Sequence, residues 1–248
     1  MSNQLLPLVL SAKALQWREQ DENSESADAE FRTVRPRVLE RDNHSCRFCG
    51  FRDPKGGKYI QVHHRDDDHH NNRMDNLVTA CMHCHAVFHI GRWGGLKEAV
   101  LIDLPELQQW QLSHMLRTIL VAQHFPAFLA TMPGVSKDKV EVAKRQADAA
   151  TALLAKFRSR EKQAEDIYLT SDPRDFASAM HLLPQELYEQ REARIKNLRL
   201  LMLGKHFEKG VDIMQEITRG WIERSKDRAG PYSGFRPTEW PSLAAASR

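Results

Sequence analysis

The stretch Cys46-Arg47-Phe48-Cys49 and its counterpart Cys81-Met82-His83-Cys84 contain all four cysteines of the chain. In each stretch two residues separate the cysteines, a spacing that lets both sulfurs reach one tetrahedral ion from a tight turn. A redox pair is the alternative, but such a CxxC normally starts a helix in a βαβ context and needs no second pair. The sequence therefore predicts one structural zinc site, on which the surrounding fold depends, with the ligands Cys46, Cys49, Cys81 and Cys84.

Length and composition define the general class of the protein. The chain has 248 residues, of which 41% are hydrophobic and 28% charged, enough for one large or two small domains with a real core. A net charge of +3 is a weak basic bias, so any phosphate-binding surface must be local. No stretch approaches the roughly 18 apolar residues of a membrane helix, and no signal-peptide pattern opens the chain. Because every cysteine lies in a CxxC pair, we expect a reducing compartment, the cytoplasm.

The chain is predicted to have an α+β fold, with a small zinc core followed by a mainly α-helical C-terminal half. Residues 1–30 are expected to form an N-terminal strand or arm and an acidic, solvated linker. Residues 31–98 form the predicted zinc module, and residues 99–226 the predicted helical domain. Residues 227–248 are rich in Gly, Pro, Ser and Ala, which is typical of a flexible tail.

Local patterns predict the elements of the zinc module. Helical spacing of apolar residues begins at Phe31, and this helix should end at Asp42-Asn43-His44. Gly50 is expected at a positive φ after the first cysteine pair. Alternation predicts a strand over Tyr59–His63 and then a polar loop. Residues 76–89 are expected to form a turn that leads into a helix near the second cysteine pair.

The C-terminal half is predicted to be helical. Pro105 suits the first turn of a helix, and Pro126 and Pro133 should break the chain. One long helix is expected from Ser136 to about Tyr168. The apolar positions of a last helix over residues 210–225 should lie mostly in the core, and a remaining apolar groove could clasp a partner helix.

The histidines around the second cysteine pair form a separate set. His85 and His89 are four residues apart, so on a helix they project from one face and can share a metal. A neutral imidazole, with a pKa near 6.5, can take a proton from water at neutral pH. The nearby loop carries three carboxylates, Asp66 to Asp68, an unusual choice for a site that receives a polyanion. His69 and His70 are expected to be solvated, and His83 to lie on the surface.

The order of these residues resembles the core of HNH, or ββα-metal, nucleases: a histidine pair on a strand, an asparagine after a loop, and histidines on a helix. The resemblance implies a second divalent metal, Mg²⁺ or Mn²⁺, held by His63, His85 and His89. It also implies that His64 is the general base for water and that Asn76 braces the loop that positions it. The phosphate backbone could then be held by Arg65, Arg73 and Arg92.

A second resemblance covers most of the chain, from about Leu5 to Trp221. Arg37–Asp42 before the first pair, Asn71–Cys81 before the second, Ser171–Arg174 and Leu198–Phe207 are similar in order to the IcmJ/DotN proteins of type IVB secretion and conjugation systems. This resemblance implies a cytoplasmic zinc protein, at the inner-membrane face through its complex. It would bind the coupling ATPase and help to present protein or DNA–protein substrates.

Three functions stay open from the sequence. The first is a coupling-complex scaffold with a structural zinc core. The second is a metal-dependent DNA endonuclease, because better-known members of the IcmJ/DotN family lack the nuclease histidines, whereas this chain has all of them. The third is a DNA- or protein-binding zinc module with neither role.

Overall fold

The structure, a computed structural model, describes residues 5–12, 24–53 and 59–224. It divides into two compact units. The first comprises Met1–Leu96 and Pro173–Arg194, and the second comprises Lys97–Asp172 and Ile195–Arg248. Helices and small antiparallel sheets occur together in the described residues, which confirms the α+β class. The domain boundaries expected at residues 30/31 and 98/99 remain a prediction, and the expected tail lies outside the described residues.

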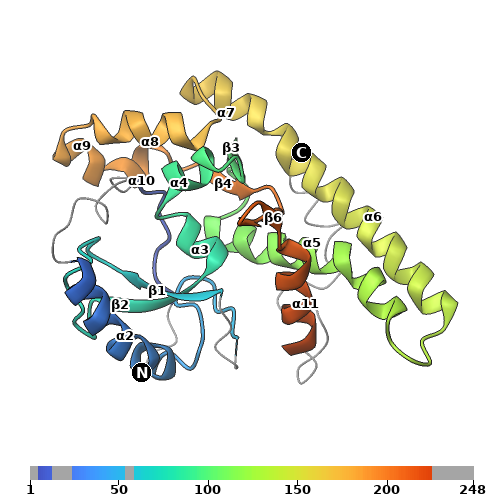
Figure 1. The fold of residues 1–248 in the computed structure, drawn as a ribbon. Helices are drawn as coiled ribbons and strands as arrows, with labels where there is room; N and C mark the ends of the chain where they lie inside the picture. Colours follow the sequence, from blue (N-terminus) through green and yellow to red (C-terminus); the bar gives the residue numbers. More distant parts are fainter. Residues whose placement is uncertain (1–4, 13–23, 54–58, 225–248) are drawn as a thin grey trace. The chain divides into compact units, whose positions relative to one another are not determined.

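The first unit is built around an antiparallel β-hairpin that a helix follows directly (Figure 1). Strand β1 pairs with β2 so that His63 faces Val78 and His64 faces Leu77 across the ladder. Helix α2 packs against both strands, with Val38 and Leu39 in a core shared with Ile60. The elements of this unit are α2 (Ser24–Arg41), β1 (Ile60–His64), β2 (Leu77–Cys81), α3 (Met82–Ala86), α4 (Ile90–Gly95), α8 (Pro173–His181), α9 (Gln185–Glu189) and α10 (Arg191–Arg194).

Two local predictions for this unit were wrong. Residues 77–81, expected as a turn, form strand β2, in which every side chain is buried, so no polar–apolar alternation reveals it. Residues 24–30, expected as part of a solvated linker, form the first turns of α2. The alanines of this stretch have a high intrinsic helix propensity.

Asp42 fastens the end of α2 to the outer edge of β2. Its fully buried carboxylate accepts hydrogen bonds from the Arg41 guanidinium (2.9 Å) and from the Thr79 amide (2.9 Å). The Arg47 guanidinium lies 3.5 Å from the same carboxylate. Burial opposes the charge of Asp42, but the bonds from Arg41 and Thr79 outweigh it and lower its pKa. After Asp42 the chain reverses through Asn43 and His44, both at positive φ, which confirms the predicted helix end.

The N-terminal arm, residues 5–12, has neither helix nor strand and is held by segments far apart in the sequence. The Leu6 amide donates to the Arg47 carbonyl (2.8 Å), and the Ser11 amide donates to the Val87 carbonyl (2.9 Å). Near the start of α10, the Arg191 guanidinium donates to the Leu10 carbonyl (3.0 Å) and to the Ser11 hydroxyl (3.0 Å). The arm therefore connects the first cysteine pair and the α3–α4 segment to α10, whose Arg191 lies 180 positions after Ser11.

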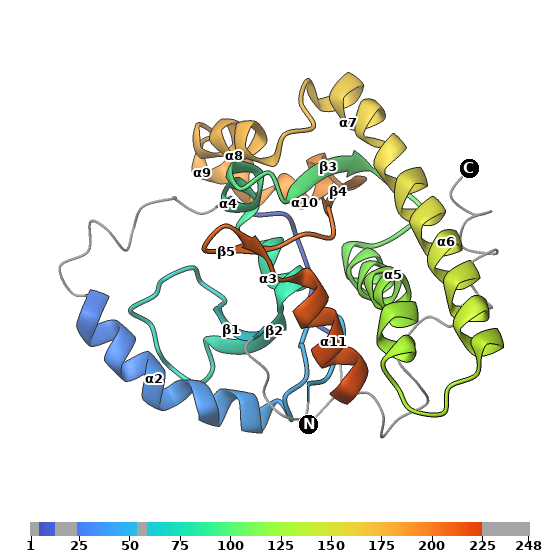
Figure 2. The ribbon, with the colours of Figure 1, turned by 45° about the vertical axis from the view of Figure 1, so that its right-hand side comes forward.

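The second unit combines a buried two-stranded sheet with long helices (Figure 2). Strand β3 pairs antiparallel with β4, and Leu101 faces Leu200 in the ladder. The elements are β3 (Ala99–Asp103), α5 (Gln109–Ala130), α6 (Lys137–Ser159), α7 (Glu161–Tyr168), β4 (Leu198–Met202), β5 (Phe207–Glu208), β6 (Val211–Asp212) and α11 (Met214–Arg224).

Both edges of the β3–β4 sheet are covered. The Leu101 amide donates to the Ser171 carbonyl (2.8 Å) at the edge of β3. At the edge of β4, the Gln109 side chain both donates to the Leu200 carbonyl (3.1 Å) and accepts from its amide (2.9 Å). Strand β3 was not predicted, and the helix expected to start near Pro105 begins only at Gln109, because the preceding residues complete the strand and its exit.

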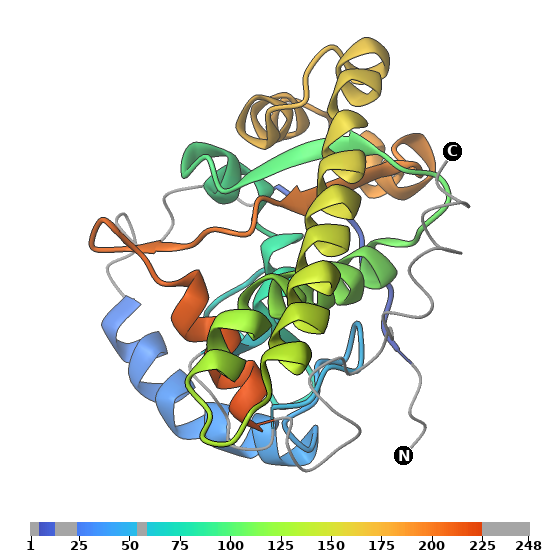
Figure 3. The same ribbon diagram turned by 90° about the vertical axis from the view of Figure 1, so that its right-hand side faces the viewer.

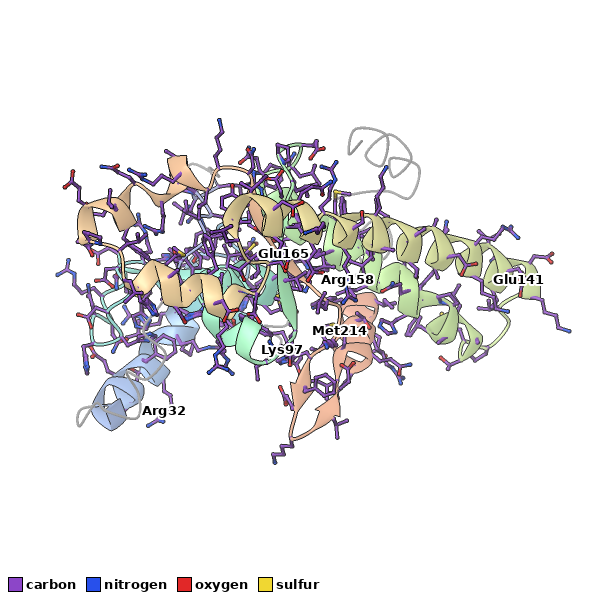
Figure 4. All side chains as sticks on the ribbon, turned by 90° about the horizontal axis from the view of Figure 1, so that it is seen from above. Arg32, Lys97, Glu141, Arg158, Glu165 and Met214 are labelled. Carbon is purple, nitrogen blue, oxygen red and sulfur yellow. The ribbon has the colours of Figure 1, made fainter. Side chains whose placement is uncertain are left out.

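Helices α5 and α6 pack along each other as an antiparallel pair, joined near Pro133 and Gly134 (Figure 2). The break predicted at Pro126 is absent, and α5 continues through this residue. Packing along α6 stabilises the helix although Pro126 has no N–H to donate. The single helix expected to Tyr168 is interrupted at Arg160, between α6 and α7. Figure 4 labels Glu141 and Arg158 near opposite ends of α6, where ion pairs join Glu141 to Lys144 and Arg158 to the half-buried Glu161.

Helix α11 packs beside α5 (Figure 3), and its Met214 and Trp221 are buried as predicted. Val211 of the same apolar stripe lies instead in β6 and is 62% exposed. The buried Glu98 carboxylate holds the start of the β5–β6 hairpin through the His206 ring (2.8 Å) and the Phe207 amide (2.9 Å). No helix among the described residues has the length and apolar character needed to cross a membrane.

Candidate metal centres

The four cysteines meet in the first unit although 32 positions separate Cys49 from Cys81. Cys46 and Cys49 lie on a turn in which the Gly50 amide donates to the Cys46 carbonyl (2.8 Å). Gly50 has a φ of 75°, as predicted, a conformation that glycine adopts without a steric cost. On the other side, Cys81 ends β2 and Cys84 lies in α3, so a strand-to-helix junction presents the second pair.

The geometry of the cysteine group fits a tetrahedral zinc ion. All four residues are buried, and their sulfurs lie within 4.8 Å of one another. The Cys49 and Cys81 sulfurs are 3.7 Å apart. Two thiolates, each about 2.3 Å from a tetrahedral zinc, would be separated by about 3.8 Å. Four sulfurs fill the coordination sphere, so a centre of this kind organises a fold and leaves no position for a substrate.

The electrostatics of this group also suit a cation. Burial and the neighbouring thiols raise the pKa of Cys46 well above its usual value, and the same causes raise the pKa of Cys84. Without a positive partner, four buried thiolates would repel one another in a medium of low polarity. A divalent ion supplies the charge that makes the deprotonated group stable.

Three histidines form a second group in the same unit. His63 lies on β1, His85 on α3, and His89 just before α4, and one ring nitrogen from each lies within 4.8 Å of the others. His63 is buried and its ring stacks on Phe88 at a centroid distance of 3.9 Å, whereas His85 and His89 are half-buried. His85 and His89 were predicted to share one helix, but α3 ends before His89. Their rings nevertheless lie close together, with 4.6 Å between the centroids. Three nitrogens with one partly open side can hold an ion and leave a coordination position free.

His64 lies beside this group on β1 but belongs to a different set of contacts. It is 5% exposed, its ring stacks on Phe31 (5.3 Å between centroids), and the His69 ring lies 4.8 Å away. The His64 Nε2 atom is 3.0 Å from Oδ1 of Asn72. His69 is therefore not simply solvated as expected, since it packs against His64, whereas His70 is exposed. His83, expected on the surface, is 2% exposed, because its position in α3 faces inward.

Asn76 and Asp66 organise the loop between β1 and β2. The Asn76 side chain donates to the Asp66 carboxylate (2.8 Å) and to the Asn71 carbonyl (2.9 Å), and its oxygen accepts from the Asp66 amide (3.2 Å). Burial opposes the charge of Asp66, but bonds from Asn71 and Asn76 lower its pKa. Asp66, the acidic residue nearest to His64 in the sequence, therefore accepts hydrogen bonds from Asn71 and Asn76 of the same loop. Of the three arginines, Arg73 pairs with Asp75 (2.9 Å), and Arg65 and Arg92 are exposed.

Several contact residues of this site were not predicted. From α2, the Phe31 ring stacks on His64 and the Glu30 carboxylate accepts a hydrogen bond from Asn72. Asn72 in turn contacts His64, so it lies between Glu30 and His64. Nothing in a single sequence marks Asn72 or Glu30, because 42 positions separate these two hydrogen-bonded residues. Phe88 was not predicted either, because its ring stacks on His63, which lies far earlier in the sequence.

These features define the class: an α+β protein in which a buried four-cysteine group with the geometry of a zinc site, and a half-buried three-histidine group, lie in and next to the β1–β2–α3 segment. The chain is similar to the Type 4 apparatus protein DotN of Legionella pneumophila subsp. pneumophila strain Philadelphia 1. The two are 29% identical over 216 residues, which cover 85% of this chain and 90% of that protein. No family model matches the chain. The similarity supports the predicted relationship to components of type IV secretion systems.

Proposed function

We propose that the protein is a zinc-organised subunit of a type IVB secretion or conjugation coupling complex. In this role it binds the coupling ATPase and helps to present substrates, and it works in the cytoplasm at the inner-membrane face. The observation that carries the proposal is the similarity to a type 4 apparatus protein along 85% of the chain, which includes residues of both units. The closed cysteine group supports it, because a filled coordination sphere suits a scaffold.

Exposed leucines offer two places where a segment of the ATPase could dock. Leu182, at the end of α8 in the first unit, is 86% exposed, and Leu169, after α7 in the second unit, is 89% exposed. Leu169 also has a φ of 64°, a left-handed conformation that a leucine rarely adopts. Single exposed leucines are common on protein surfaces, so the two positions serve here as one probe for each unit.

The experiment is co-expression of the full chain with the coupling ATPase of the same gene cluster, followed by size-exclusion chromatography. Co-elution is expected for the wild type. Leu182→Asp and Leu169→Asp serve as matched variants, each replacing one exposed leucine in one unit, and loss of co-elution in one of them assigns the docking unit. An ATPase that elutes alone from the zinc-loaded wild type contradicts the proposal.

A second candidate function, a metal-dependent DNA endonuclease of the HNH type, rests on a different observation. The predicted ligands His63, His85 and His89 converge, and the predicted base His64 lies on the adjacent position of β1. Asn76 bonds within the loop that follows His64, as a bracing residue would. A divalent ion at the three histidines would stabilise negative charge on a scissile phosphate. Imidazole ligands favour zinc-like ions, whereas Mg²⁺ and Mn²⁺ prefer oxygen, so several ions must be compared.

In this candidate, the side chains have distinct tasks. His64 accepts a proton from the attacking water, the loop held by Asn76 keeps the ring in place, and Arg65 and Arg92 bind flanking phosphates. The test is nicking of supercoiled plasmid by purified protein with Mg²⁺, Mn²⁺, Ni²⁺ or Zn²⁺. His64→Ala should abolish nicking, and His70→Ala, which alters an exposed histidine of the same loop, should retain it. Intact plasmid with every ion excludes the nuclease.

A further inference from the structure

A hydrogen-bonded chain runs from α2 through the β1–β2 loop to the His64 ring. Nδ2 of Asn72 donates to Oε2 of Glu30 (3.1 Å), and Oδ1 of Asn72 lies 3.0 Å from Nε2 of His64. Asn72 itself is 5% exposed, and its backbone N–H donates to the His70 carbonyl (3.0 Å). The amide side chain is therefore fixed at both ends and at its backbone.

The chemistry of the three groups determines which way the protons point. An ionised carboxylate only accepts hydrogen bonds, so Glu30 must face the NH₂ group of Asn72. The oxygen of Asn72 must then face His64, and because that oxygen only accepts, Nε2 of His64 must carry the proton. In a neutral imidazole the other nitrogen is the acceptor, which is Nδ1 here.

We propose that Asn72, oriented by Glu30, is a positioning residue that holds neutral His64 as the Nε2–H tautomer and makes Nδ1 its proton-accepting atom. Phe31 stacks on the ring and His69 lies against it, so the ring plane is also held. The tautomer follows from the hydrogen bonds alone, and only its use in taking a proton from water rests on the second candidate function.

The direct test is ¹⁵N–¹H correlation spectroscopy of the full-length, zinc-loaded protein with ¹⁵N-labelled histidine, at a pH where the imidazoles are neutral. The signals of His64 are assigned by their loss in His64→Gln. The expected result is the Nε2–H pattern, with a ring N–H protected from exchange. An Nδ1–H pattern in the wild type overturns the proposal.

Variants separate positioning from a general structural effect. Asn72→Ala should abolish the protected Nε2–H signal, whereas the double variant Asn72→Asp with Glu30→Gln, which keeps an acceptor for Nε2 and supplies a donor to it from position 30, should retain it. Glu30→Gln should weaken it, because a glutamine can face either end of the Asn72 amide, and Glu40→Gln on the same helix is the control. Asn71→Ala, which removes a loop bond to Asp66, should leave the signal unchanged. A signal that persists in Asn72→Ala refutes the role of Asn72.

Plasmid nicking provides the functional readout. If the wild type nicks DNA, Asn72→Ala should lower the rate by about ten- to hundredfold, as supporting residues around reactive groups do. Asn71→Ala should change it far less, and equal rates for the two variants contradict a positioning role. If the wild type does not nick DNA, the second candidate function fails, and the spectra still decide the tautomer.

Discussion

The cysteine group and the histidine group lie in one small unit, yet they differ in burial and in the number of donor atoms. The four cysteines are all buried, and sulfurs occupy every direction around their centre. Within the three-histidine group His63 is buried, whereas His85 and His89 keep partial exposure. An ion in the first group would have only sulfur neighbours and would stabilise the fold, whereas an ion in the second would keep room for water or a ligand. The contrast teaches that burial and donor count, more than the presence of metal-binding residues, separate a structural centre from a reactive one.

The largest expected effect comes from breaking the closed group. Cys84→Ala removes one of four zinc ligands, and structural zinc can contribute on the order of 10 kcal/mol to folding. We expect loss of zinc by elemental analysis and rapid proteolysis of the first unit. His85→Ala, next in the sequence, should keep the zinc. A folded Cys84→Ala protein without zinc would show that the two groups do not differ in this way.

A smaller effect is expected from a mutation of Asp42, which stabilises the segments around the cysteine group without binding metal. Asp42→Ala leaves Arg41 without its carboxylate and removes the acceptor of the Thr79 amide. Breaking such a buried pair should lower the free energy of unfolding by about 3 kcal/mol, with zinc content unchanged. Urea denaturation of the zinc-loaded protein measures this loss, and Asp75→Ala, which breaks an exposed ion pair with Arg73, should leave the free energy of unfolding nearly unchanged.

Acid should reproduce part of this effect. The pKa of Asp42 is lowered below its usual 3.8 in the folded protein, so its stabilising contribution is complete above about pH 4. It is lost as the pH falls through the lower pKa of the folded state. Asp42→Asn should therefore lose less stability than the wild type as the pH falls below about 4, measured by urea denaturation. Equal losses would show that zinc release alone causes the acid sensitivity.

The smallest effect on stability is expected at the half-open group. His89→Ala should change the free energy of unfolding by less than about 1 kcal/mol, because the side chain is partly exposed. The same variant should weaken binding of a second divalent ion by about a hundredfold or more, measured by calorimetry on zinc-loaded protein. A large loss of stability would make the histidine group structural as well.

How well the sequence predicts the structure varies between these regions. The cysteine and histidine groups could be predicted because ligand chemistry imposes spacing that is visible in the chain. Strands β2 and β3 could not, because Leu77–Cys81 and Ala99–Asp103 have no exposed side chain to give an alternating pattern. Pro126 within α5 and the buried His83 depend on packing partners far away in the sequence. The Glu30–Asn72–His64 chain is of the same kind, since its members come from three separate segments.

The N-terminal arm has a consequence for how the protein is made. Residues 5–12 are synthesised well before Tyr188 and Arg191, so their bonds to these two residues must wait until the last part of the first unit has left the ribosome. Lys97–Asp172, which belongs to the second unit, is synthesised in between. The first unit therefore closes late, and the nascent chain must keep its opening segment available until then.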